Sequence, residues 1–301
     1  MAKPNIIFDT SKFDLFEMCE ERFNIRYNLN LIPPSKKPQL DRGVIVHIGN
    51  EVYYQALKDG VKYDDAAHKA LSKIREAGVT ASDLEADEVN RIIDVMEEYY
   101  DYWREADENL HIDEVESSFL YQLHEDDEIC YHMAGKIDLV VSDNRYTHEP
   151  WDHKTRDRIG EELRLSNQFR NYCYALNSNY ITINRIGFQK TLKPHEKFTR
   201  PRLSYDPPML EKWKQNVIKR MQLYLICVAE NMWPMNETSC DKFHRRCEYY
   251  NVCESSGDAA RNYKLSTDFI ETDEWDVTKV LRRATEVMTD EQKKRAGITV
   301  D

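Results

Sequence analysis

The spacing of hydrophobic residues predicts helices in the first third of the chain. Within residues 9–28, phenylalanine and cysteine side chains recur every three or four positions, which is typical of one buried helix face. Three further helices are predicted by the same criterion, over residues 43–57, 63–78 and 81–107, the last with a cap near Ser82.

The middle of the chain changes to a strand pattern. Residues 115–155 contain β-rich runs that are broken by polar turns at 124–128 and 142–145. This pattern predicts three antiparallel strands joined as a meander.

A second group of elements follows the meander. The pattern predicts a helix over 161–178, a strand over 180–191, a helix over 207–232 and, in a polar tail, a helix near 276–288. This order predicts an α/β fold, with a small central mixed β-sheet flanked by helices and with helical additions at both ends of the chain.

Length and composition fit a globular protein. The 301 residues suffice for one large domain or two smaller ones, and 41% hydrophobic residues argue against disorder. No segment approaches the ~18 apolar residues of a membrane helix. The first residues lack the pattern of a signal peptide, so we expect a reducing cytoplasm. There, seven cysteines favour metal binding or chemistry over disulfides.

The charge of the chain is uneven. The net charge is −12, which by itself speaks against a nucleic-acid partner. Residues 152–202, however, hold eleven lysines and arginines against five acidic residues, a balance of +6. An acidic protein with one basic segment can still present a local groove for phosphates.

Two acidic residues and a lysine occur within the predicted meander. Asp138 lies in the second strand, and Asp152 and Lys154 lie two apart in the third, so that both point to one face. A hairpin can bring Asp138 beside them. Two carboxylates and a lysine suit Mg²⁺ or Mn²⁺, which prefer oxygen ligands and activate water. An Asp-x-Lys pair on a strand is more often a solvated surface pair, so the interpretation depends on further residues.

Two further features accompany this cluster. His47 lies in an apolar helical pattern, where a lone histidine is more often a core residue than a ligand. Gln168 and Tyr172 lie four residues apart, on one face of a predicted helix. Alone, neither feature indicates a function.

In this order, these residues resemble the RecB-type branch of the PD-(D/E)xK nuclease superfamily. The resemblance rests on the histidine, on GKID at 135–138, on DHK at 152–154 and on QFRNY at 168–172. It implies a restriction-endonuclease-like sheet and a site for Mg²⁺ or Mn²⁺. The implied metal ligands are His47, Asp138, Asp152 and the backbone carbonyl of His153.

The resemblance also implies roles for the other motif residues. Lys154 would activate the attacking water, whereas Gln168 and Tyr172 would contact the DNA backbone or neighbouring active-site residues. Many members carry glutamate where this chain has Asp152, and either carboxylate can ligate an ion. Glu51, one turn after the histidine, could add a ligand, although a helical glutamate is usually solvated.

Three cysteines lie within fourteen residues near the end of the chain. The same branch includes CRISPR-adaptation nucleases and AddB-type helicase-nucleases, in which a lone cysteine before the nuclease motifs joins three after them. The resemblance therefore implies a [4Fe-4S] cluster, connecting the first helix to the C-terminal segment, with ligands Cys19, Cys240, Cys247 and Cys253. Zinc is the main alternative, because four thiolates also suit tetrahedral Zn²⁺. The other cysteines, Cys130, Cys173 and Cys227, lie in apolar patterns and are predicted core residues.

The function expected from these residues is that of a metal-dependent DNA exonuclease. It would act on single strands or DNA ends in recombination, repair or CRISPR-type adaptation, in a bacterial cytoplasm or, for a viral protein, in that of the host. Further candidates for DNA contacts are Arg156, Arg158, Arg170 and Lys190. Two alternatives remain: a DNA-end-binding or adaptor subunit of a larger complex, and a zinc protein with a structural role.

The resemblance also predicts the domain boundaries. Residues 1–255 form the predicted nuclease domain, with its core motifs within 43–193. The tail, residues 256–301, has no assigned role, and we expect it to pack on the body or to contact a protein partner. No GxxxxGK[ST] pattern is present, so no helicase motor is expected within this chain.

Overall fold

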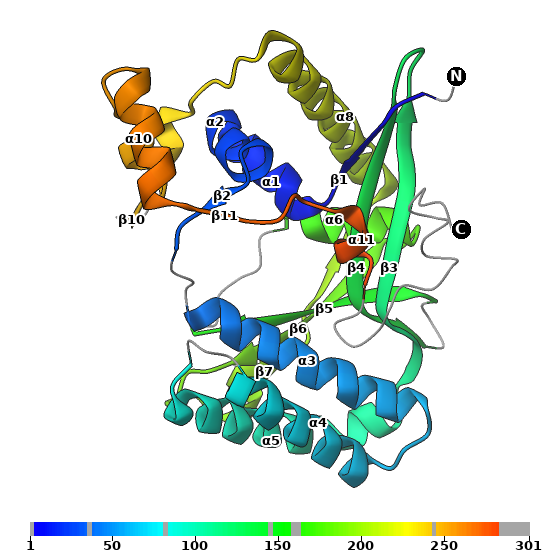
Figure 1. Cartoon of the computed structure of the whole chain (residues 1–301). Coiled ribbons are helices and arrows are strands. Elements are labelled where there is room, and N and C mark those ends of the chain that lie inside the picture. The colour runs from blue at the N-terminus through cyan, green and yellow to red at the C-terminus, as the bar shows by residue number, and fades with distance from the viewer. Residues whose placement is uncertain are drawn as a thin grey trace, which may run out of the picture.

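The described residues contain one central mixed sheet of seven strands (Figure 1). The computed structural model describes residues 3–34, 38–80, 84–143, 147–157, 164–242 and 245–282. The strands of this sheet are β1 (Asn5–Phe8), β3 (His111–Glu125), β4 (Cys130–Ser142), β5 (Glu149–Arg156), β6 (Tyr180–Gly187), β7 (Phe198–Thr199) and β8 (Arg202–Ser204).

The pairing of the strands confirms the predicted meander and the predicted α/β class. β3, β4 and β5 pair antiparallel in chain order. β6 adds parallel to β5, and both β7 and β8 pair antiparallel with β6. The sequence analysis missed β1, a strand of four residues that pairs parallel with β4.

Two strands share one edge of β4. β3 pairs with β4 along almost its whole length, so β1 and β5 must both lie on the opposite edge. β1 pairs there with residues 130–133, and β5 pairs with residues 139–141. Between these two stretches, residues 134–138 of β4 have no strand partner on that edge within the described sheet.

Helices cover the sheet at both ends (Figure 1). One group, at the bottom of Figure 1, consists of α3 (Pro38–Lys58), α4 (Tyr63–Thr80) and α5 (Ala86–Glu108). The other consists of α1 (Thr10–Met18), α2 (Glu20–Phe23), the π-helix η1 (Asn24–Asn28), α6 (Asn167–Ala175) and α8 (Pro207–Glu230). The short α7 (Pro194–Lys197) precedes β7. Each group buries its own apolar cluster against the sheet, so the sheet has two main cores.

Several predicted boundaries are wrong. The predicted first helix breaks at Cys19, which has extended backbone angles (φ −170°, ψ 119°) between α1 and α2. α3 begins at Pro38, five residues before the predicted start, and α6 begins only at Asn167. The cap predicted near Ser82 lies outside the described residues.

The C-terminal part consists of short elements. They are the 3-10 helix η2 (Glu237–Ser239), β9 (Asp241–Lys242) paired with β10 (Arg245–Arg246), α9 (Tyr250–Cys253), α10 (Asp258–Asp268), β11 (Ile270–Glu271) paired with β2 (Leu31–Ile32), and α11 (Val277–Val280). The sequence analysis did not predict α10. The predicted helix near 276–288 is described only as far as residue 282, and α11 covers its start. In the part of the chain that the structure describes, no helix combines the length and the apolar character needed to cross a membrane.

A buried ion pair connects the sheet to the α3–α5 group. The guanidinium of Arg200, between β7 and β8, binds the carboxylate of Asp107 on α5 through two contacts, of 2.6 and 3.0 Å. The same guanidinium donates to the hydroxyl of Tyr54 on α3 (3.0 Å) and lies 3.9 Å from the ring centroid of Trp103. Both charged side chains are almost fully buried. Such a pair is sensitive to the loss of one partner, because the remaining charge stays buried without compensation.

Replacement of Asp107 by asparagine is expected to destabilise the fold. We predict that Asp107→Asn lowers the free energy of unfolding by about 3–5 kcal/mol, because the buried Arg200 loses its counter-charge. Urea denaturation followed by circular dichroism measures this change. The matched control is Asp64→Asn, which removes the exposed 3.1 Å contact with Arg104 and should cost ~0–1 kcal/mol. Equal losses in the two variants would contradict a special role for the buried pair.

Candidate active site

Strand β5 separates from β4 at the centre of the sheet. The two strands pair only over residues 139–141 and 149–151. Beyond this stretch, the backbone N–H of His153 donates to Oδ2 of Asp138 (2.7 Å), so a side chain from β4 occupies the place of a backbone acceptor. This separation allows the carboxylates of Asp138 and Asp152 to approach one another between the strands, as the sequence analysis expected.

Strand β3 contributes a buried carboxylate that the sequence analysis missed. The strand pairs on either side place Glu116 across from Asp138. Glu116 has a φ of +51°, a strained conformation that is uncommon for a residue other than glycine. The usual alternation of strand side chains is interrupted here: Ile137 packs with α6, whereas Leu139, two residues further on, packs with α3–α5. The hydrophobic periodicity of the sequence therefore gave no signal for Glu116. The one available signal was an acidic residue in the strand that neighbours the GKID strand.

Helix α3 places His47 beside these two carboxylates. Its Nδ1 lies 3.4 Å from Oδ1 of Asp138. One ligand atom each from His47, Glu116 and Asp138 lies within 4.8 Å of the other two. Gly49 allows α3 to approach α4, because a Cβ at this position would lie 2.5 Å from Cδ1 of Ile74.

A chain of hydrogen bonds connects Lys154 to helix α6. Its Nζ lies 2.8 Å from Oδ2 of Asp152 and donates to Oδ1 (3.0 Å) and to Oε1 of Gln168 (2.8 Å). Gln168 donates to the hydroxyl of Tyr172 (2.9 Å), which donates to the backbone carbonyl of Lys136 (2.6 Å) on the unpaired edge of β4. Both residues of the predicted Gln-xxx-Tyr pair thus contact neighbouring active-site residues, which was one of their two expected roles.

The charges of His47 and Asp138 stabilise one another. Burial lowers the pKa of His47, but the negative charge of Asp138 and its contact with the imidazole outweigh burial and raise this pKa to about 9. Burial likewise raises the pKa of Asp138, but the positive charge of His47 overrides it and holds this pKa well below its usual range. The histidine is therefore a partner of the acidic cluster rather than an isolated core residue.

The other two carboxylates carry uncompensated charge. Burial raises the pKa of Asp152 to about 6 even though the Lys154 ammonium opposes this, and the charge of Asp138 adds to the rise. Burial and the charge of Asp138 raise the pKa of Glu116 to about 7, although it contacts the ammonium of Lys136. Both shifts mean that burial, with the charge of Asp138, disfavours the ionised carboxylates more than Lys154 and Lys136 stabilise them.

The imidazole of His153 packs beneath the site. It stacks on the ring of Tyr54, with 5.3 Å between centroids, and its Nδ1 lies 2.8 Å from Nδ2 of Asn184. Burial lowers the pKa of this histidine to about 3, so the ring is neutral. The imidazole of His153 is thus engaged by Tyr54 and Asn184. The prediction that His153 is a metal ligand concerns its backbone carbonyl and not this ring.

The donor set fits a divalent cation. Glu51, which the sequence analysis considered as a further ligand, is buried like the other three carboxylates, and its charge contributes to the raised pKa of Glu116. Oδ2 of Asp152 is buried without a well-directed hydrogen bond, because Lys154 donates to Oδ1 instead. Carboxylate and imidazole donors with excess negative charge suit Mg²⁺ or Mn²⁺. The compact group differs from the predicted ligands in one respect: it includes Glu116, whereas Asp152 is paired with Lys154.

The predicted DNA contacts differ in their surroundings. Arg156, at the end of β5, and Lys190, after β6, are exposed. Arg170 is half-buried, and its guanidinium donates to the backbone carbonyl of Leu165 (2.5 Å) at the start of α6. Arg158 lies outside the described residues.

The four cysteines predicted as cluster ligands lie in one region. The backbone N–H of Asn236 donates to Sγ of Cys19 (3.4 Å), and that of Cys247 donates to the carbonyl of Cys240 (2.8 Å). Burial raises the pKa of the thiols of Cys240, Cys247 and Cys253, the last to about 12, and the charge of Cys19 contributes to each rise. Among the described residues, no three cysteine sulfurs lie within 4.8 Å of one another.

The remaining cysteines are placed largely as predicted. Cys173 and Cys227 are buried in apolar clusters, in agreement with their expected place in the core. Cys130, at the start of β4, is only partly buried, so its assignment to the core was wrong. Its position at the first residue of β4, next to the polar turn, explains the partial exposure.

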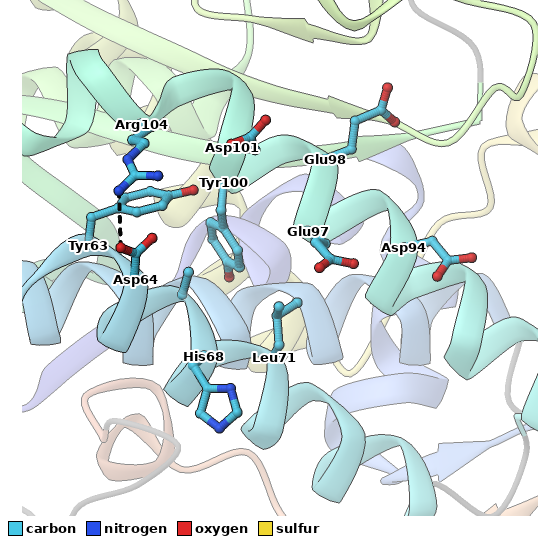
Figure 2. Close-up of a pocket in the computed structure, with 11 residues that line it drawn as sticks. Tyr63, Asp64, His68, Leu71, Asp94, Glu97, Glu98, Tyr100, Asp101 and Arg104 are labelled. Carbon is cyan, nitrogen blue, oxygen red and sulfur yellow. Dashed lines mark hydrogen bonds and ion pairs between the residues drawn. The ribbon is translucent and has the colours of Figure 1, made fainter.

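A separate pocket lies between α4 and α5 (Figure 2). It has a volume of about 620 Å³, and none of the predicted site residues lines it. Figure 2 shows several carboxylates around it, from Asp64, Asp94, Glu97, Glu98 and Asp101. Negative walls repel phosphate groups, so this side of the molecule is unsuited to bind a nucleic-acid backbone.

Comparison with known protein families agrees with the superfamily that the sequence resembles. A family model described as the PD-(D/E)XK nuclease superfamily matches residues 10–254, which is most of the chain and includes the histidine, both carboxylate motifs, the lysine and all four clustered cysteines. No curated protein sequence matches the chain. The mixed sheet flanked by helices agrees with the restriction-endonuclease-like fold expected for this family. The chain therefore belongs to the PD-(D/E)XK nuclease superfamily.

Proposed function

We propose that the protein is a metal-dependent deoxyribonuclease that removes nucleotides from single-stranded DNA or DNA ends. The observation that carries the proposal is the convergence of His47, Glu116 and Asp138 on one small volume, with the Asp152–Lys154 pair beside it. A DNA-binding adaptor would have little need for this complete set of groups.

The residues divide the chemistry between them. His47, Glu116, Asp138 and Asp152 would hold Mg²⁺ or Mn²⁺, together with the backbone carbonyl of His153. When bound, such an ion lowers the pKa of a water molecule and neutralises phosphate charge. Lys154 orients the attacking water and stabilises the negative charge that develops on the phosphate. Gln168 keeps the Lys154 ammonium in place through its 2.8 Å hydrogen bond.

The charge distribution supports a narrow DNA substrate. The protein has a net charge of −12, and the α4–α5 side is lined by carboxylates. Even in the basic segment 152–202, Lys197 pairs with Glu98 and Arg202 pairs with Glu149. The positive surface left for phosphates is therefore limited, which suits a single strand or an end better than an enclosed duplex. DNA processing in recombination, repair or CRISPR-type adaptation fits such a substrate.

Removal of the Lys154 ammonium is expected to abolish most of the activity. We predict that Lys154→Met lowers the rate of DNA hydrolysis by about 10²–10⁴-fold, because the water loses its orienting group. Release of nucleotides from 5′- and 3′-blocked labelled oligonucleotides with Mn²⁺ measures the rate, and chelation of the metal should stop it. Lys73→Met, which removes a surface lysine of α4 that pairs with Glu76, serves as the control and should retain most of the activity.

The oligonucleotide assay also separates the proposal from its alternative. Tight DNA binding by the wild-type protein without any cleavage would contradict the enzyme and support an adaptor subunit. Full activity of Lys154→Met would contradict the assigned role of this lysine.

The proposal includes a [4Fe-4S] cluster held by Cys19, Cys240, Cys247 and Cys253. The four thiols come from both ends of the matched region, and Cys19 influences the pKa of each of the other three. The three C-terminal cysteines are separated by six and five residues along the chain, which is wider than the paired CxxC motifs of zinc ribbons and favours iron–sulfur over zinc.

The colour of the purified protein tests the cluster. We predict that anaerobically purified protein is brown with absorbance near ~400 nm, because thiolate-ligated iron absorbs there and zinc does not. Cys19→Ser should lose the colour and some stability, since it removes a ligand that joins the two ends of the domain. Cys130→Ser should keep the colour. A colourless wild-type protein that contains zinc would overturn this part of the proposal.

A further inference from the structure

Lys136 contacts both the acidic site and the C-terminal segment. Its Nζ lies 2.5 Å from Oε2 of Glu116 and donates to the backbone carbonyl of Arg282 (3.2 Å). Glu116 is buried, whereas about a quarter of the Lys136 side chain is exposed. Lys136 is therefore an active-site cation that also reaches solvent, and none of the roles assigned above uses it.

The C-terminal segment is firmly held at this position. We refer to residues 270–282 as the strap. It begins with β11, which pairs with β2, and continues to Trp275, whose Nε1 donates to Oδ2 of Asp9 (3.0 Å). Val277 and Leu281 then pack against Ala134 of β4. The strap thus runs along β4 and brings its last described carbonyl groups next to the site.

The strap lies beyond the residues that match the nuclease family. The match ends at residue 254, and the strap begins sixteen residues later. Ser118 of β3 donates to the carbonyl of Leu281 (2.7 Å), close to the contact of Lys136 with Arg282. Arg282 itself is exposed. The last described residues of the strap therefore add two backbone acceptors and one exposed arginine next to the site.

Lys136 and a metal ion would compete for the same carboxylate. Glu116 belongs to the compact group that can hold an ion, yet one of its oxygens contacts the ammonium. An ammonium within a few ångströms of a divalent cation also repels it. The protein's own cation thus balances the charge of Glu116, and its simultaneous contact with the carbonyl of Arg282 leaves Lys136 one partner when Glu116 turns away.

We propose that Lys136 exchanges partners during the reaction. It neutralises Glu116 in the metal-free protein, and when Glu116 turns to a bound ion, the ammonium remains at the strap and binds a phosphate of the DNA. This inference rests on the proposed nuclease function and assigns the strap a role as one wall of the DNA-binding site. Lys136 is then a substrate-contacting residue whose charge also weakens metal binding.

Opposite changes in the affinity for Mn²⁺ and in the affinity for DNA distinguish this role of Lys136 from a purely structural role. In Lys136→Met, we expect Mn²⁺ to bind on the order of tenfold more tightly, because a nearby positive charge is removed. The KM for single-stranded DNA should rise about three- to tenfold, and its salt dependence should weaken by roughly one phosphate contact. Lys136→Arg keeps the charge and should restore both values. In Glu116→Gln, Mn²⁺ should bind at least about tenfold more weakly.

Calorimetry of the full-length protein with Mn²⁺ and without DNA measures the metal affinity. Lys73→Met is the control, because this lysine pairs with Glu76 on the surface of α4, outside the strap, and should change neither value. Thermal unfolding identifies any variant that has lost its fold.

The outcomes separate the two levels of the proposal. Weaker Mn²⁺ binding in Lys136→Met, like that in Glu116→Gln, would overturn the competition and leave Lys136 as a structural residue. Tighter Mn²⁺ binding with an unchanged KM would overturn the contact with DNA. If the wild-type protein cleaves no DNA at all, the nuclease proposal fails, whereas the calorimetric comparison still decides whether Lys136 competes for Glu116.

Discussion

The separation of β5 from β4 is the constraint on which the candidate site depends. Paired strands satisfy their own backbone groups and leave no room for side chains between them. Here pairing stops after Trp151, and the carboxylate of Asp138 accepts the N–H of His153 instead. The hydroxyl of Tyr172 satisfies the carbonyl of Lys136 on the same edge of β4. Side chains thus replace the missing backbone hydrogen bonds between β4 and β5, and the same side chains carry the chemistry of the site.

Buried carboxylates in this space create a demand for positive charge. Each ionised group costs free energy when it leaves water, unless a cation compensates it. His47, Lys136 and Lys154 compensate part of the charge, yet the pKa values of Asp152 and Glu116 remain raised. The protein maintains this imbalance because the surrounding structure is rigid: the Arg200–Asp107 pair connects α5 to the sheet, and its neighbour Tyr54 supports His153. A bound divalent ion would relieve the imbalance, which is the physical basis of the proposed metal site.

Residue type and spacing, together with the family resemblance, were sufficient to predict much of the site. The motif residues His47, Asp138, Asp152 and Lys154 come together as expected, since a strand, a turn and a strand bring the last three close and an apolar helix carries the first. Glu116 could not be predicted, because its left-handed backbone breaks the alternation on which strand patterns depend. The break of the first helix at Cys19 was missed because the helical spacing of apolar residues continues across the break. The contact of Cys19 with Asn236 is a tertiary contact, which the local sequence pattern does not reveal. The short strand β1 is stabilised by its neighbour β4 rather than by its own sequence, so its pattern carried little signal.

The central claim is that His47, Glu116 and Asp138 hold one divalent ion at the point where the strands separate. The most direct measurement is X-ray diffraction from crystals grown with Mn²⁺, with data collected at the manganese absorption edge. The account predicts one strong anomalous peak bonded to Glu116 and Asp138, at about 2.0–2.3 Å from their oxygens, with His47 completing the group. An ordered Mn²⁺ elsewhere in the protein, with these three side chains keeping their metal-free contacts, would contradict it.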